Sequence, residues 1–129
     1  MATTLGITKI GQVAIMVEDV DRAITFYRDV LELPFLFRYG DLAFLQCGEV
    51  RLLLEKPPEN PQGAATPGNS ILYYQVPDIQ QAYSSLKERG VPFIDEPHMI
   101  AKMADHDLWM VFFRDSEGNT VALMAEVRS

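Results

Sequence analysis

Apolar residues in the first half of the chain change from strand spacing to helix spacing. Residues 12–17 form a short apolar run with β-branched side chains, which predicts a largely buried strand. Asp19 follows at the position of a helix N-cap, and Pro34 marks the helix end because a residue before proline is pushed out of the helical conformation. Between them, spacings of four, three and four positions predict a core-facing helical stripe: Val20, Ile24, Tyr27 and Leu31.

Three short strands are predicted after this helix, over residues 35–39, 42–47 and 50–55. They are separated by Gly-Asp and Gly-Glu pairs, which are typical of turns between strands. The first half of the chain is therefore predicted to be a β-α-β-β-β unit.

The second half repeats this order. A strand is predicted over residues 71–76, followed by a helix that begins after Asp78 and stops at Gly90. Return strands are predicted to begin at 92–94, to continue over 108–114 and to close over 120–126, after a turn at residues 115–119.

The two halves also share sequence. Val17, Asp19, Val20 and Ala23 recur 59 positions later as Val76, Asp78, Ile79 and Ala82. This duplication predicts one domain made of repeat one (8–55), a linker (56–70) that contains four prolines, and repeat two (71–127). Ligands tend to bind in the crevice between two such copies, so the residues that line this crevice are the candidates for ligand binding.

Charge and composition exclude several classes of function. The net charge of −7 argues against nucleic acid as a partner, because phosphate binding needs a basic surface. No apolar stretch reaches the length of a membrane span and no secretory signal pattern is present, so we expect no membrane partner and a cytoplasmic location. The single cysteine, Cys47, cannot form an internal disulfide and is expected to be a structural thiol.

Two stretches link this arrangement to a known family. Residues 17–33 (VEDVDRAITFYRDVLEL) follow the first strand, and residues 113–119 (FRDSEGN) precede the last. With the tandem repeat, they resemble the vicinal-oxygen-chelate superfamily, which includes glyoxalase I, bleomycin-resistance proteins and extradiol dioxygenases. The resemblance covers about residues 10–126. It implies an α+β fold in which the repeats form a curved mixed sheet around a central cup, with the helices on the outer face.

The resemblance also implies four positions for metal ligands, from the first and last strand of each repeat. They correspond here to Gln12, Leu52, Ile71 and Ala122, of which only Gln12 has a coordinating side chain. A divalent cation needs several oxygen or nitrogen donors, so no metal and no cofactor is expected at this position. A shift in strand register would leave Glu55 as an alternative ligand in repeat one.

Strand alternation extends these positions to a candidate ligand site. If Gln12 faces the cup, so does Met16; Tyr73 and Gln75 follow with Ile71, and Met124 and Glu126 with Ala122. Such a lining suits a small apolar or aromatic organic ligand, unless the side chains simply fill the space. The candidate ligand-binding residues are Gln12, Met16, Leu52, Tyr73, Gln75, His98, His106, Trp109, Ala122 and Met124.

About a dozen extra residues enter repeat two, within residues 95–109, and this segment contains both histidines of the chain. It is a candidate lid on a predicted loop. His98 and His106 with nearby acids could hold a metal, or one of them, with Glu126 as a further candidate, could act as acid or base. The third alternative is a solvated turn, with Trp109 in the core or at a dimer interface.

Three functions follow from these observations. The first is a metal-independent small-molecule-binding protein similar to the bleomycin-resistance branch, as a homodimer. The second is an isomerase or lyase acting beside a carbonyl, with His98 or His106 as the base. The third is a non-catalytic dimerisation module. No phosphate-binding loop, dinucleotide fingerprint or nucleophile motif is present to favour another class of enzyme.

Overall fold

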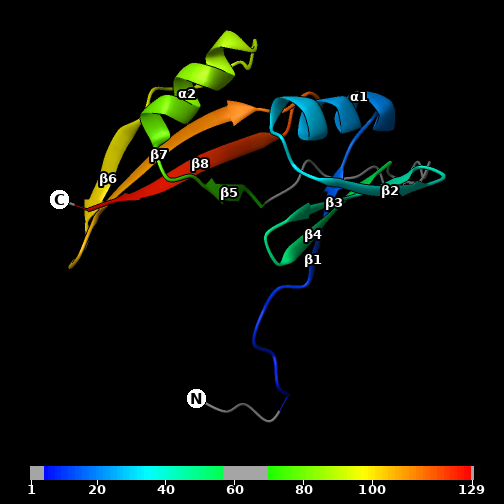
Figure 1. Cartoon of the computed structure of the whole chain (residues 1–129), viewed down its shortest axis with the longest axis horizontal. Helices are drawn as coiled ribbons and strands as arrows, with labels where there is room; N and C mark the ends of the chain where they lie inside the picture. Colours follow the sequence, from blue (N-terminus) through cyan, green and yellow to red (C-terminus); the bar gives the residue numbers. More distant parts are fainter. Residues whose placement is uncertain (1–4, 57–69, 129) are drawn as a thin grey trace. The chain divides into compact units, whose positions relative to one another are not determined.

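The computed structural model describes residues 5–56 and 70–128, and the chain divides into two compact units, Met1–Pro57 and Pro58–Ser129. Each unit contains one four-stranded mixed sheet with a helix on one face (Figure 1). The predicted α+β fold class is therefore confirmed. The predicted linker, 56–70, lies almost wholly outside the described residues. A central cup depends on how the two sheets are placed relative to each other, and it stays a prediction.

The first unit has the predicted β-α-β-β-β order. Its elements are β1 (Gln12–Met16), α1 (Val20–Ile24), a π-helical continuation η1 (Thr25–Val30), β2 (Phe35–Tyr39), β3 (Leu42–Cys47) and β4 (Val50–Glu55). The sheet order is β1-β4-β3-β2, in which β1 and β4 are parallel and the other pairs are antiparallel.

The first helix begins as predicted and changes its hydrogen bonding part-way. The Asp19 side chain accepts a hydrogen bond from the Arg22 backbone N–H at 3.0 Å, which satisfies one free donor of the first turn. From Thr25 onward the helix is of the π type, and the Leu31 N–H donates to the Phe26 carbonyl five residues earlier. The predicted apolar stripe is buried at Val20, Ile24 and Tyr27, and α1 packs on β3 and β4.

The two helices end at equivalent positions of the duplication. Glu32 follows the first helix with φ +64°, and Gly90 follows the second with φ +88°, 58 positions later. This left-handed conformation is common at the residue after a helix, where glycine adopts it without steric cost. The sequence signal for a helix stop is therefore plain in the second repeat and hidden by Glu32 in the first.

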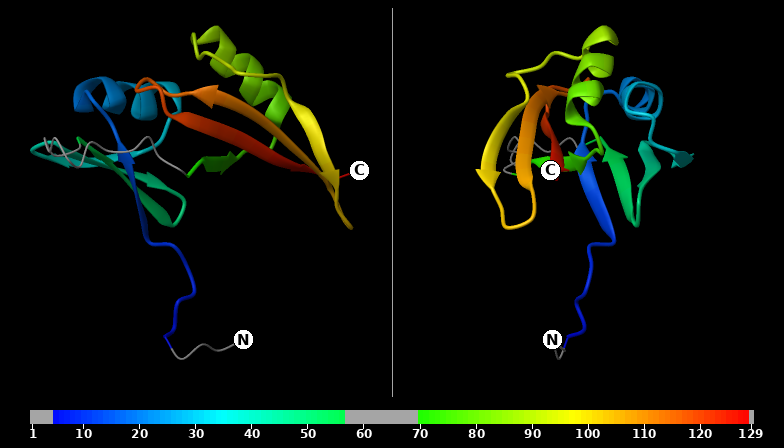
Figure 2. Two further views of the ribbon diagram at one scale, coloured as in Figure 1. Left: turned by 180° about the vertical axis from the view of Figure 1, so that it is seen from behind. Right: turned by 60° about the vertical axis from the view of Figure 1, so that its left-hand side comes forward.

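The second unit is built in the same way. Its elements are β5 (Leu72–Gln75), α2 (Ile79–Glu88), β6 (His98–Lys102), β7 (Asp107–Arg114) and β8 (Thr120–Val127). The sheet order is β5-β8-β7-β6, with β5 and β8 parallel (Figure 2). The Asp78 side chain caps α2 by accepting from the Gln81 N–H at 3.1 Å, as predicted.

Residues 95–109 do not form the predicted loop. The segment contains β6 and the start of β7, which pair as an antiparallel hairpin around a turn at residues 103–106. Most side chains of β6 are exposed, so no alternation of apolar and polar residues marks the strand in the sequence. The return strand expected at 92–94 is reduced to one isolated bridge, between Phe93 and Phe113.

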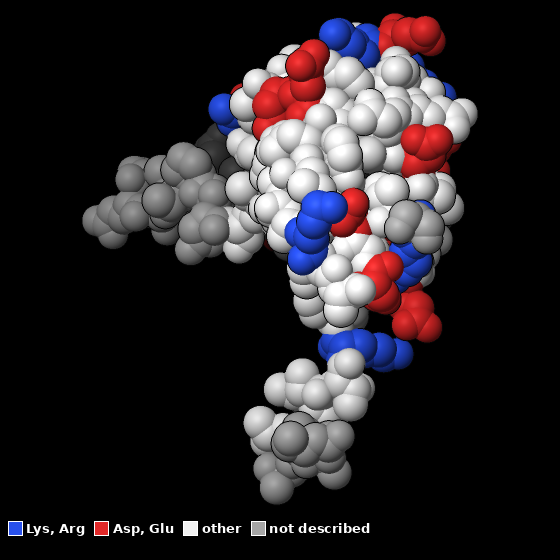
Figure 3. All heavy atoms as spheres, turned by 90° about the vertical axis from the view of Figure 1, so that its left-hand side faces the viewer, with Lys and Arg blue, Asp and Glu red and all other residues white. Residues whose placement is uncertain are grey.

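No helix within residues 5–56 and 70–128 is long and apolar enough to cross a membrane. The charged side chains also show no basic stripe on the face seen in Figure 3, where Lys and Arg lie scattered among acidic and uncharged residues. A phosphate backbone is bound by gathered basic side chains, and this face does not offer them.

Candidate functional site

Each sheet has an open face, defined here as the face that no helix of the same unit covers. On the open face of the first unit, side chains form rows across paired strands. The polar row contains Gln12, Arg51 and Gln46. The aromatic row contains Ala14, Leu53, Phe44 and Phe37, and a third row contains Met16, Glu55, Leu42 and Tyr39. Gln12 and Met16 thus share a face, as predicted.

Leu52 does not share that face. It is paired with Val13 in the parallel β1–β4 ladder, whereas Gln12 and Ala14 are paired with Arg51 and Leu53. Leu52 is therefore buried on the helix-covered face, and the expectation that it lies beside Gln12 is wrong. The predicted position is one residue out of register, and a shift of one residue turns a side chain to the opposite face. Leu53 holds the corresponding open-face position and is equally unable to coordinate a metal.

The open face of the second unit contains half of the predicted ligand-binding residues. Tyr73, Ala122 and Phe112 are paired across β5, β8 and β7 in one row. Gln75, Met124, Met110 and His98 form the next row, and Glu126 is paired with Leu108 beyond it. Five predicted residues from three strands, together with Glu126, are thereby brought to one face: Tyr73, Gln75, His98, Ala122 and Met124.

Trp109 lies on the opposite face. It is paired with Ala125 and Met99, and Ala125 is buried on the side where α2 packs against β7 and β8. Trp109 therefore does not share a face with Ala122 and Met124, and it lies on the side of the sheet where the alternative interpretation, a core residue, would place it. Its position in the sequence, next to the extra segment, contained no information about the face it would occupy.

Two aromatic rings flank Ala122. Tyr73 and Phe112 both pair with this residue, and their rings meet edge to face with centroids 5.8 Å apart. This contact depends on the small methyl side chain between them, and Ala122 is 0% exposed. The position that corresponds to a metal ligand is thus closed by an aromatic contact, which is a favourable arrangement in its own right.

His98 and His106 have separate surroundings. The His98 Nδ1 atom lies 2.7 Å from the Glu96 carbonyl oxygen and 3.9 Å from an Asp95 carboxylate oxygen. His106 lies in the turn between β6 and β7. Within the parts of the chain that the structure describes, no group of three or more His, Cys, Asp or Glu side chains is placed to hold a metal ion.

His106 is held between two carboxylates. Its Nδ1 atom lies 2.7 Å from Asp105 Oδ1, its Nε2 atom lies 3.9 Å from Glu126 Oε2, and its side chain is only 13% exposed. Arg128 joins the same group at 3.1 Å from Glu126 and 3.5 Å from Asp105. The hydrogen bond with His106 is the main reason that the pKa of Asp105 is lowered. Asp105 therefore stays ionised and orients the imidazole.

Comparison with known proteins places this arrangement in a family. A family model described as Glyoxalase/Bleomycin resistance protein/Dioxygenase superfamily matches residues 9–123. The chain belongs to this superfamily. The match includes most of both repeats, so it confirms the family that the sequence resemblance implied.

Individual proteins are similar over nearly the whole chain. The Bacillus subtilis (strain 168) protein YurT, described as uncharacterized, is 29% identical and covers 90% of this chain and 98% of its own. YraH from the same strain, also described as uncharacterized, is 24% identical over 89% and 96%. A crystal structure of lactoylglutathione lyase from Agrobacterium tumefaciens has a TM-score of 0.75 and 25% identity, and covers 92% of this chain and 93% of that chain.

The metal ion that the superfamily resemblance implies does not fit the residues present. Gln12 and Leu53 occupy the two positions in the first unit, and they offer one amide oxygen. In the second unit Ile71 precedes β5, and Ala122 lies between two aromatic rings. A cation at either pair of positions would be left mostly without ligands in apolar surroundings.

Several open-face residues escaped the sequence prediction. Met110 and Phe112 could have been found, because the turn at 115–119 sets Arg114 opposite Thr120 and hence Phe112 opposite Ala122. Phe37 could not, since an irregularity between Phe35 and Phe37 breaks the alternation of β2.

Proposed function

We propose that this protein binds a small apolar or aromatic organic molecule without a metal ion. The observation behind this proposal is the contact of Tyr73 and Phe112 beside Ala122, at a centroid distance of 5.8 Å. In place of a carboxylate that would attract a cation, this position offers aromatic surface. Ligand sites in proteins combine such apolar surface with a few hydrogen-bonding groups, here Gln75 and His98 in the neighbouring row.

The proposal predicts binding that is independent of metal. Thermal unfolding of the purified protein is measured against a panel of aromatic compounds, with a chelator and again with Mn²⁺. At a concentration about 100 times its Kd, a compound that binds only the folded protein adds about 2.7 kcal/mol of stability. We expect the same stabilisation in both conditions.

A matched pair of variants locates the binding. Phe112→Ala removes one ring beside Ala122, and we expect affinity to fall about fivefold to tenfold with the loss of aromatic contact. Trp109→Phe changes a residue of the opposite face and should leave affinity unchanged. Stabilisation that depends on Mn²⁺ contradicts the proposal, as does equal loss of affinity in both variants.

A second candidate function rests on His106. When Nδ1 donates its proton to Asp105 at 2.7 Å, the neutral imidazole presents the lone pair of Nε2, which lies 3.9 Å from Glu126 Oε2. An isomerase or lyase that removes a proton beside a carbonyl needs such a base.

This candidate predicts hydrogen exchange beside a carbonyl. Carbonyl compounds are incubated with the protein in deuterated water, and deuterium uptake next to the carbonyl is followed by NMR. We expect His106→Ala to abolish uptake while His98→Ala retains it, because His98 contacts a backbone carbonyl in place of an orienting carboxylate. Uptake that persists in His106→Ala excludes the candidate.

A further inference from the structure

The guanidinium group of Arg51 lacks a carboxylate partner among the described residues, whereas three other arginines each pair with a carboxylate. Arg28 pairs with Asp29, Arg38 with Asp21, and Arg128 with Glu126 and Asp105. For Arg51, the described residues provide no hydrogen bond or ion pair to the side chain. The contact that holds it is with an aromatic ring, since its Cζ atom lies over the Phe44 ring, 6.0 Å from the centroid.

The neighbours of Arg51 leave its positive charge uncompensated. The residues paired with it in the polar row, Gln12 and Gln46, are both neutral amides. The carboxylate on the same strand and face is Glu55, four residues along β4, which corresponds to about 13 Å at 3.3 Å per residue. An exposed cation to which residues 5–56 and 70–128 offer no hydrogen bond or ion pair, in a chain of net charge −7, is an unusual feature of this face.

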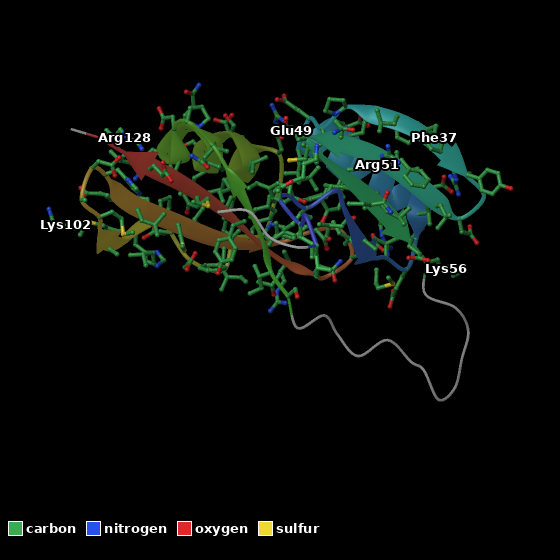
Figure 4. All side chains as sticks on the ribbon, turned by 90° about the horizontal axis from the view of Figure 1, so that it is seen from below. Phe37, Glu49, Arg51, Lys56, Lys102 and Arg128 are labelled. Carbon is green, nitrogen blue, oxygen red and sulfur yellow. The ribbon has the colours of Figure 1, made fainter. Side chains whose placement is uncertain are left out.

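An aromatic surface lies beside Arg51. The rings of Phe37 and Phe44 are stacked, with centroids 4.4 Å apart and planes inclined by 22°. Phe37 is nevertheless 49% exposed, so one side of this pair is open to a further ring. Figure 4 shows Phe37 and Arg51 on the sheet of the first unit, on β2 and β4.

An irregularity in β2 places Phe37 there. Phe35 pairs with Leu45, on the helix-covered face, whereas Phe37 pairs with Phe44 on the open face. In a regular strand these two residues would point to the same side. The extra residue between the two pairs turns Phe37 to the open face, and bulges of this kind are frequent beside binding sites because they redirect a side chain.

We propose that the open face of the first unit binds a planar aromatic carboxylate. Its ring packs across the exposed edges of the Phe37 and Phe44 rings, and its carboxylate receives hydrogen bonds from the Arg51 guanidinium, whose planar arrangement of donors matches a carboxylate. Glu55 repels the anion from the far end of the same face and so orients the ligand. This inference rests on the proposed metal-independent binding of aromatic molecules, and it adds a surface on the first unit to the one proposed beside Ala122.

The test compares two probes of nearly equal shape, naphthoate and its neutral counterpart naphthylmethanol, by calorimetry in the presence of a chelator. We expect Arg51→Gln to weaken naphthoate binding about tenfold and to leave naphthylmethanol binding unchanged. Phe37→Leu removes the ring surface and is expected to weaken both probes. Arg51 is exposed, so its substitution is compatible with folding.

Arg28→Gln is the control for net charge, since it removes one positive charge from an exposed helical position. If it weakens naphthoate binding as much as Arg51→Gln does, the inference is wrong. It is also wrong if the wild-type protein binds naphthoate no better than naphthylmethanol, although metal-independent binding of naphthylmethanol then still supports the proposed function. If naphthylmethanol binds only when a metal is added, the proposed function is contradicted. The effect of Arg51→Gln on naphthoate binding still tests the inference about Arg51 separately.

Discussion

Asp115→Ala is expected to lower the free energy of unfolding by about 3 kcal/mol, because it leaves buried N–H donors without an acceptor. Asp115 is only 4% exposed. Its Oδ1 atom accepts from the backbone N–H groups of Glu117 and Asn119, each at 2.8 Å, and its Oδ2 atom accepts from Asn119 Nδ2 at 3.0 Å. Alanine removes all three hydrogen bonds at once.

The loss should extend beyond the turn itself. Residues 115–119 join β7 to β8 and set Arg114 opposite Thr120, which in turn sets Phe112 opposite Ala122. A loosened turn weakens this register, so ligand binding on the open face should decline together with stability.

Urea unfolding measures this effect, with two further variants for comparison. Asp115→Asn keeps one oxygen acceptor and should cost roughly 1 kcal/mol. Asp41→Ala changes an exposed aspartate in another turn and should remain within about 0.5 kcal/mol of wild type. An unfolding free energy for Asp115→Ala equal to that of Asp41→Ala shows that the buried carboxylate does not organise the turn.

Ala122→Glu is expected to lower the free energy of unfolding by about 4 kcal/mol, since it adds volume and an unpaired charge at a fully buried position. The new side chain must separate the Tyr73 and Phe112 rings, whose centroids are 5.8 Å apart. It places a carboxylate at a position that the family resemblance assigns to a metal ligand. The other family position of the second unit is Ile71, which cannot share a cation, so we expect added Mn²⁺ to leave the loss of stability unchanged.

The matched control is Ala14→Glu. Ala14 occupies the corresponding row of the first unit but is exposed, so the same substitution should cost less than about 0.5 kcal/mol. Thermal unfolding of both variants, with and without Mn²⁺, tests whether a carboxylate at position 122 completes a metal site. Recovery of the Ala122→Glu variant by Mn²⁺ contradicts our conclusion, because it means that the remaining residues can complete a metal site.

Local signals predicted most of the secondary structure. Asp19 and Asp78 cap their helices as expected, since an aspartate side chain satisfies a free N–H within its own turn. The turn after Arg114 follows from residues within five positions of one another. These features depend on short-range contacts, which the sequence displays directly.

Positions that depend on pairing between distant strands were predicted less well. The prediction for Leu52 is wrong, because the side-chain direction in a strand alternates at every residue and a one-residue error in register reverses it. The sequence predicts a loop where β6 forms. The strand pairs with β7 through backbone hydrogen bonds, and its side chains show no alternation of burial that the sequence could display.

The sequence by itself determined the duplicated β-α-β-β-β units, the superfamily and the absence of a donor set at the metal positions, because each depends on residue type and local spacing. The tertiary structure decided which residues share a face. It placed the rings of Tyr73 and Phe112 beside Ala122, and it brought Arg51 next to Phe37 and Phe44. Strand register and a bulge produce these contacts, and both result from packing across the sheet.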